Sequence, residues 1–129
     1  MAMSGTEDRL LRVLRATMVS LSRGEQRDLS ARQMAVMLIC YGPDGDQTVR
    51  GLAAMLGLAK PAVTRALDRL ADLDLLRRQP DPRDRRSVLT RCTPKGAGFM
   101  RQLQALLIAA AAGSGRPGPS KSRRKPPAR

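Results

Sequence analysis

Apolar residues recur with helical spacing at the start of this chain. They follow one another at intervals of three and four, which places them on one face of a helix from about Glu7 to Ser22. The residues on this face are Leu10, Leu14, Met18 and Leu21. Gly24 comes shortly after the last of them and ends the predicted helix.

A second helix is predicted to begin at Ser30. Ser30 and Gln33 have the spacing of a capping box, in which each side chain accepts the backbone N–H of the other residue. The residues from Met34 to Cys40 are apolar almost all round. Because a helix without a polar face belongs in the interior of a domain, we expect this one to be central and buried.

Two short helices joined by a glycine are predicted next. Thr48 is a good N-cap, and apolar residues follow it at helical spacing as far as Leu56. Gly57 ends that helix, and Leu58 can anchor the turn. Pro61 fits the first turn of the following helix, where no amide hydrogen is missed. Helix, turn and helix therefore follow one another within about 25 residues.

The second of these helices is amphipathic. Its apolar stripe consists of Val63, Leu67 and Leu70. At about 100° per residue, Arg65 lies roughly opposite Val63 and Leu67. This outward face is one that could enter a DNA groove.

A β-hairpin with a basic loop is predicted after the helices. Residues 75–79 and 87–92 read as short strands, the second with alternating side chains. Pro80 and Pro82 would disrupt an interior strand, so we place them in the hairpin loop. The loop sequence, residues 81–86 (DPRDRR), carries three arginines, and its two aspartates could pair with some of them and hold another outward.

A last helix is predicted from Thr93-Pro94, which supplies an N-cap and a first-turn proline. Its apolar side consists of Phe99, Leu103, Leu106, Leu107 and Ala110. We therefore divide the chain into an N-terminal helix (1–28), a helix-turn-helix with hairpin (29–92), a C-terminal helix (93–113) and a basic tail (114–129). The tail is rich in Gly, Pro, Ser, Arg and Lys, a composition typical of disorder.

The charge of the chain favours a polyanionic partner. The net charge is +13 over 129 residues, with six basic and no acidic residues in the tail. Residues 77–95 hold seven more basic residues against two acids, so the excess is concentrated at the hairpin. The tail is either a solubilising end or an arm that adds salt-dependent, sequence-independent affinity for DNA.

Several function classes are not supported. The chain has no histidine, no paired carboxylates in an apolar setting and no Gly-rich phosphate loop, so we expect neither an enzyme nor a metal or other cofactor. No apolar run is long enough to cross a bilayer, and the N-terminus does not resemble a signal peptide. Cys40 and Cys92 match no metal spacing and read as small buried residues, with a redox-sensing pair as the alternative.

The order of these segments resembles the MarR family of bacterial transcriptional regulators, which are winged-helix proteins. The resemblance covers about residues 29–100 and is carried by LSARQMAVMLI, LAAMLGLAKPAVTRALDRL, DPRDRR and LTRCTPKG. It implies a mainly α fold with a small β-hairpin wing (α+β), flanked by N- and C-terminal dimerisation helices. It also implies a cytoplasmic homodimer on a pseudo-palindromic DNA operator, often controlled by a small-molecule effector or an oxidant.

The resemblance assigns residues to both surfaces. Six positions near the start of the second short helix are expected to face the major groove, and three wing arginines to reach the DNA, one of them in the minor groove. These are Lys60, Pro61, Ala62, Thr64, Arg65 and Arg69, then Arg83, Arg85 and Arg86. The expected dimer contacts are Leu10, Leu14 and Met18 with Phe99, Leu103, Leu106 and Leu107, although these side chains could also pack within one chain.

This chain departs from the family pattern at three places. Ala59 replaces a frequent capping Ser, and Asp74 replaces a frequent Gly before the first wing strand. Asp tolerates the left-handed backbone conformation better than most residues. The family usually has one more long helix for dimerisation where this chain has its basic tail.

We expect a sequence-specific DNA-binding regulator, most simply a repressor. Two alternatives stay open: a winged-helix module that binds proteins of the transcription machinery, and an architectural, sequence-nonspecific DNA binder.

Overall fold

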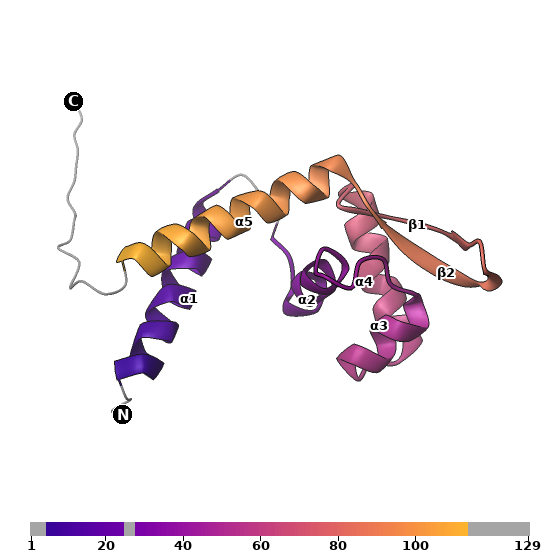
Figure 1. The fold of residues 1–129 in the computed structure, drawn as a ribbon, viewed down its shortest axis with the longest axis horizontal. Helices are drawn as coiled ribbons and strands as arrows, with labels where there is room; N and C mark the ends of the chain where they lie inside the picture. The colour runs from indigo at the N-terminus through magenta and orange to yellow at the C-terminus, as the bar shows by residue number, and fades with distance from the viewer. Residues whose placement is uncertain (1–4, 25–27, 114–129) are drawn as a thin grey trace. The chain divides into compact units, whose positions relative to one another are not determined.

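The computed structural model describes residues 5–24 and 28–113, and the tail predicted at 114–129 lies outside this range (Figure 1). The described elements are α1 (Gly5–Arg23), α2 (Ala31–Cys40), α3 (Val49–Leu56), α4 (Lys60–Asp72), β1 (Leu76–Asp81), β2 (Asp84–Cys92) and α5 (Pro94–Gly113). They form two compact units. One holds α2, α3, α4, the β1–β2 hairpin and the start of α5 up to Gln102, and we call it the winged-helix unit. The other holds α1 and the rest of α5 from Leu103.

The predicted helix boundaries in the winged-helix unit are confirmed. Ser30 Oγ accepts the Gln33 backbone N–H at 3.1 Å and Gln33 Oε1 accepts the Ser30 N–H at 2.9 Å, which completes the capping box. Thr48 Oγ1 caps α3 by accepting the Gly51 N–H at 2.9 Å. Gly57 ends α3 with a φ of 63°, a conformation that favours glycine. Local sequence signals therefore fix the start of α2 and both ends of α3.

The core of the winged-helix unit is aliphatic, with one phenylalanine. Its buried members come from α2, α3, α4, the segment before and into β1, and α5: Val36, Met37, Cys40, Leu52, Val63, Ala66, Leu67, Leu70, Leu73, Leu75, Leu76 and Phe99. The prediction of a fully buried α2 was too strong, because Leu38 is 51% exposed and Ile39 only half-buried. Although residues 34–40 are all apolar, α2 covers the core with one side and leaves Leu38 outside it.

The hairpin is longer than predicted, and its loop is shorter. Pairing is regular from Leu76–Cys92 to Pro80–Val88, and Asp81 then pairs with Asp84. Only residues 82 and 83 form the turn, so placing Pro80 in the loop was wrong. A two-stranded sheet has only edge strands, and Pro80 can occupy one because its missing N–H can face away from the partner. The register shift leaves residues 85–87 without partners in the hairpin, as in a bulge.

A polar cluster joins the start of β1 to the start of α5. Tyr41 Oη donates to the Leu75 carbonyl at 2.6 Å and accepts the Thr93 N–H at 3.1 Å. Thr93 Oγ1 accepts the Gly96 N–H at 2.9 Å, which confirms the predicted cap. A Cβ at Gly96 would lie 1.8 Å from Tyr41 Oη, so this position requires glycine.

Asp74 has a φ of 59°, a left-handed conformation that fits a position where the resembled family frequently has glycine. It is the only non-glycine residue with positive φ among the residues described. The tight turn it makes leads directly from α4 into β1. None of the described helices has the length and hydropathy to cross a membrane.

Candidate nucleic-acid interface

Helix α4 presents a polar face opposite its buried stripe. Val63, Ala66, Leu67 and Leu70 point into the core. Five of the six positions predicted for the major groove are exposed: Lys60, Pro61, Thr64, Arg65 and Arg69. The sixth, Ala62, is half-buried. Ala59 precedes the helix without a side-chain cap, as its sequence predicted.

The cations of this face have no intramolecular partner in the described part of the chain. No ion pair or side-chain hydrogen bond there engages Lys60, Arg65 or Arg69. Unpaired guanidinium groups on a helix are free to donate to phosphate oxygens or to the acceptor edge of guanine. The outward face of α4 thus combines exposure, positive charge and unused donors.

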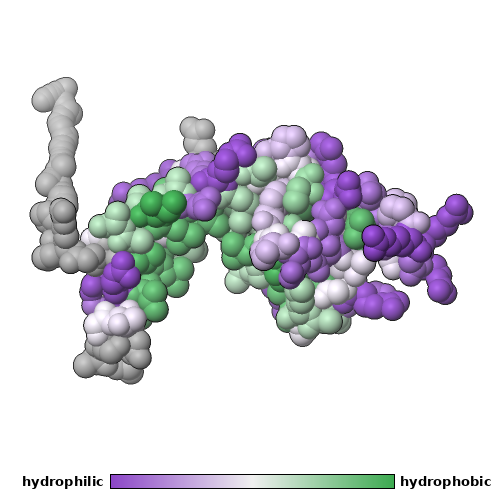
Figure 2. Space-filling model, in the orientation of Figure 1, coloured by the Kyte–Doolittle hydropathy of each residue, from purple (hydrophilic) through white to green (hydrophobic). Residues whose placement is uncertain are grey.

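Aspartate side chains hold the backbone at two of the wing arginines. Asp81 accepts the Arg83 backbone N–H at 2.9 Å, and Asp84 accepts that of Arg86 at 3.1 Å. The prediction that these acids pair with wing guanidiniums holds only weakly, since Arg86 Nε is 3.8 Å from Asp84 and its side chain is 95% exposed. The side chains of Arg83 and Arg85 make no ion pair with residues in the described ranges. Figure 2 shows the hydrophilic surface that projects from the hairpin.

Other arginines of the hairpin are committed to partners within the chain. Arg78 binds Asp68 of α4 at 2.7 Å, and Arg91 binds Asp46 at 2.9 Å. Arg77 lies 3.6 Å from Asp74. The sequence did not distinguish these arginines from those of the turn, because their partners lie on other elements or at a neighbouring turn. These three arginines lie on the regularly paired part of the hairpin, whereas the unpaired Arg83 and Arg85 lie in the turn and just after it.

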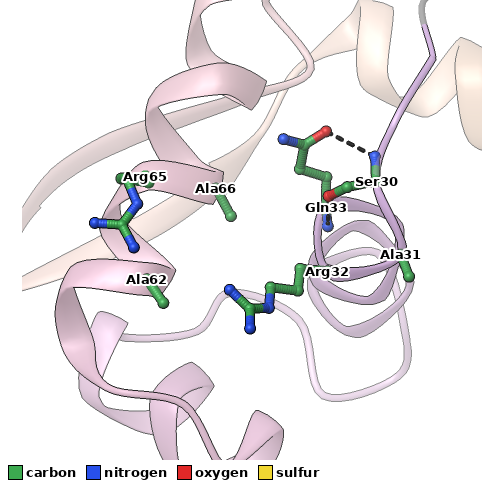
Figure 3. Close-up of a pocket in the computed structure, with 7 residues that line it drawn as sticks. All are labelled: Ser30, Ala31, Arg32, Gln33, Ala62, Arg65 and Ala66. Atoms are coloured by element: carbon green, nitrogen blue, oxygen red, sulfur yellow. Dashed lines mark hydrogen bonds between the residues drawn. The ribbon is translucent and has the colours of Figure 1, made fainter.

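A cavity of about 430 Å³ lies between the N-terminus of α2 and α4. It is lined by Ser30, Ala31, Arg32, Gln33, Ala62, Arg65 and Ala66. Figure 3 shows Arg32 extending from α2 toward α4, beside the Ser30–Gln33 hydrogen bond. Sequence reasoning did not select Arg32; its place in the first turn after a capping box was the available signal.

A second groove, of about 440 Å³, lies between the start of α3 and the wing. Its lining includes Thr48, Pro82, Arg83 and Leu89. Thr48 also forms a β-bridge with Leu89, which ties the start of α3 to β2. The wing tip and α3 therefore border one continuous surface of the unit.

The two cysteines lie close together but differ in exposure. Cys40 is buried and 3.4 Å from Thr90 Oγ1, whereas Cys92 is exposed, so predicting two buried cysteines was half wrong. Cys92 Sγ lies 3.6 Å from the Cys40 carbonyl. Desolvation raises the pKa of both thiols above the ordinary value of 9.0, the Cys92 thiol being only partly buried. No group of three metal-binding side chains occurs among the residues described.

The predicted dimerisation residues fall into two groups. Leu10, Leu14 and Met18 of α1 are about half exposed, and Leu107 of α5 is exposed. Figure 2 shows this hydrophobic surface over α1 and the C-terminal part of α5. In contrast, Phe99 lies in the core of the winged-helix unit, Leu103 is buried in the single chain, and Leu106 is half-buried. Phe99 already has an intramolecular place, so a dimer contact is not needed to explain it.

Comparison with known proteins identifies relatives of this arrangement. The family model described as "MarR family" matches residues 29–88. The HTH-type transcriptional regulator MhqR of Bacillus subtilis is 31% identical over 75 residues, which cover 58% of this chain and 51% of MhqR. The matched segment therefore spans about half the length of this curated relative.

Solved structures share the fold. RV1404 of Mycobacterium tuberculosis aligns with a TM-score of 0.67 at 27% identity, over 83% of this chain and 70% of that one. A mutant of MarR from E. coli, solved in complex with operator DNA, aligns with a TM-score of 0.61 at 28% identity, over 83% and 69% of the two chains.

Proposed function

Residues 29–88 of this chain belong to the MarR family, and on that premise we propose that the chain is a transcriptional regulator that binds double-stranded DNA through α4 and the wing. One observation carries the proposal: the cations of the outward α4 face, together with Arg83 and Arg85 of the wing, are unpaired within the described chain, whereas Arg77, Arg78 and Arg91 along the strands are paired. The relative solved with operator DNA supports the choice of partner.

Each surface has its own role in the proposed complex. Arg65 and its neighbours on α4 read base edges in the major groove, because a helix fits that groove and guanidinium matches guanine acceptors. Arg83 and Arg85 bind the backbone and the minor groove at the wing, where a narrow groove attracts arginine. The register shift beside the turn leaves Arg85 without a partner in the hairpin, and irregularities of this kind can redirect side chains.

A binding titration on DNA from the gene's own upstream region, against random DNA of equal length, tests these roles. Arg65→Ala should lower the affinity for the preferred fragment by about tenfold and relax the sequence preference. Arg85→Ala should weaken binding to both DNAs and reduce the salt slope by about one. Arg15→Ala, which removes the same charge from exposed α1, is the matched control and should change little.

The proposal is contradicted if both the α4 variant and the wing variant bind DNA with the same affinity as the unchanged chain. A binding constant that does not depend on salt would favour the protein-interaction alternative instead.

We further propose a homodimer formed through α1, which acts as a repressor by occupying a pseudo-palindromic site. The exposed Leu10, Leu14 and Met18 support a partner for this helix, since exposed apolar side chains in a row mark an association surface. A dimer would set two recognition helices at half-sites about one helical turn apart.

A sequence-nonspecific DNA binder is the second candidate, and the tail favours it. Six of the 24 basic residues lie in the last 16 positions, without an acid. Truncation after Gly113 separates the two functions. A specific regulator keeps its footprint after this truncation and loses only salt-dependent affinity, whereas a nonspecific binder driven by the tail loses most of its binding.

A further inference from the structure

Two carboxylates lie in the middle of the outward face of α4. At about 100° per residue, Asp68 falls between Thr64 and Arg65 around the helix axis, and Asp72 lies on the same side as Arg65, about two turns further on. Both aspartates are exposed. Phosphates repel carboxylates because both are negatively charged. A carboxylate at the centre of a surface that faces DNA therefore needs a physical explanation.

Asp68 has a partner on the wing. Its Oδ1 accepts from Arg78 Nη1 at 2.7 Å, a distance typical of a charge-assisted hydrogen bond. The Arg78 side chain is 33% exposed and that of Asp68 54%, so the pair is partly shielded from solvent. Asp72 has no ion pair within the described residues. The two acids therefore differ in contact but not in charge or helix face.

The pair joins two elements that the backbone connects only through a tight turn. Arg78 lies on β1, which begins after the left-handed residue Asp74. Beyond that turn, core contacts hold the base of β1 through Leu76. Arg78 is two residues further along, where the strand leaves the core and the ion pair is the polar link to α4.

We infer that Asp68 is a positioning residue for DNA recognition: it holds Arg78, fixes the wing relative to α4 and withholds that guanidinium from phosphates. The inference rests on the proposed DNA-binding function. Because α4 and the wing are held in a fixed relative position, a DNA whose major groove fits α4 also places its minor groove at the wing. Without Asp68, Arg78 becomes one more free cation that binds any duplex, and the wing loses its polar link to α4 and becomes more mobile.

The experiment compares Asp68→Asn with Asp72→Asn, two variants that remove one negative charge from the same helix face. In the DNA-free full-length chain, Asp68→Asn should speed hydrogen exchange of the β1 and β2 amides, and Asp72→Asn should leave it unchanged. On DNA, Asp68→Asn should reduce discrimination between the upstream fragment and random DNA by about two- to fivefold, the range expected of an exposed ion pair. This reduction should come mainly from tighter binding to random DNA.

A double-variant cycle completes the test. Arg78→Gln should free the wing as Asp68→Asn does, and the double variant should show no further gain in exchange. The inference is overturned if both asparagine variants raise random-DNA affinity equally with wing exchange unchanged, because Asp68 then acts only through its charge. It is also overturned if Asp68→Asn loses preference at a single base pair with wing exchange unchanged, because Asp68 then reads cytosine directly.

The two proposals fail in different ways. A chain that binds no DNA fragment preferentially contradicts the proposed function. The exchange comparison needs no DNA and still reports whether Asp68 holds the wing.

Discussion

The winged-helix unit and helix α1 use similar amphipathic sequences with opposite results. In the winged-helix unit, Leu52 and Leu70 are fully buried against other elements of the same chain. In α1, Leu10 is 58% exposed and Leu14 53% exposed. Full burial of such a side chain stabilises by about 1.5–3 kcal/mol. Periodicity therefore predicts which face of a helix is apolar, but not whether the chain itself or a second copy covers that face.

The largest difference between buried and exposed apolar side chains is expected in the core of the winged-helix unit. Leu70→Ala should lower the free energy of unfolding by about 2–5 kcal/mol, because it removes a fully buried side chain and leaves a cavity. Leu38→Ala, at an exposed leucine of the same unit, is the control and should cost less than about 0.5 kcal/mol. Urea unfolding followed by circular dichroism measures both. Equal effects would mean that the unit does not pack as described.

The next largest effect is expected at α1. Leu14→Asp places a charge on the exposed apolar face, and each proposed dimer contains that position twice. The dimer dissociation constant, measured by sedimentation equilibrium, should rise at least tenfold, because each lost leucine contact is worth about 1.5–3 kcal/mol. Leu38→Asp tests an exposed leucine outside α1 and should leave association unchanged. A monomeric unchanged chain at high concentration would refute the proposed dimer.

A smaller difference in unfolding free energy is expected between a hydroxyl group of the winged-helix unit and one of α1. Tyr41→Phe removes the hydroxyl that bonds both the Leu75 carbonyl and the Thr93 N–H, and should cost about 1–2 kcal/mol of unfolding free energy. Ser22→Ala removes a hydroxyl that donates to the Met18 carbonyl at an exposed site of α1. Thermal unfolding should be nearly unchanged in this control. If the two substitutions have equal cost, the cluster around Tyr41 does not hold the unit together.

Local signals explain why much of the fold was predictable. A capping box at Ser30, a cap at Thr48, a left-handed glycine at Gly57 and a cap at Thr93 act within three or four residues, so the sequence displays them directly. The hairpin loop was mispredicted because the position of the turn depends on cross-strand register. Pro80 pairs with Val88, where a proline is tolerated because the strand lies at the edge of the sheet. The sequence alone does not show that this strand is an edge strand.

The candidate site divides in the same way. The exposure of Lys60, Arg65 and Arg69 follows from helical geometry, so the outward cations of α4 were predictable. Ion pairs between elements were not predictable, because the sequence does not show that Arg78 contacts Asp68. Nor does an apolar position on a helix reveal its neighbour, and Phe99 was assigned to a dimer contact when it lies in the core.

The smallest predicted effect concerns the start of α4, which has a first-turn proline but no side-chain cap. Ala59 has the extended backbone of an N-cap, φ −71° and ψ 150°, but offers no side-chain acceptor to α4. Ala59→Ser should raise the free energy of unfolding by about 0.5–1 kcal/mol. Ala54→Ser, at an exposed interior position of α3, is the control and should be neutral or slightly destabilising. If serine at position 59 adds nothing, core packing and Pro61 already fix the start of α4, and a side-chain cap is not needed there.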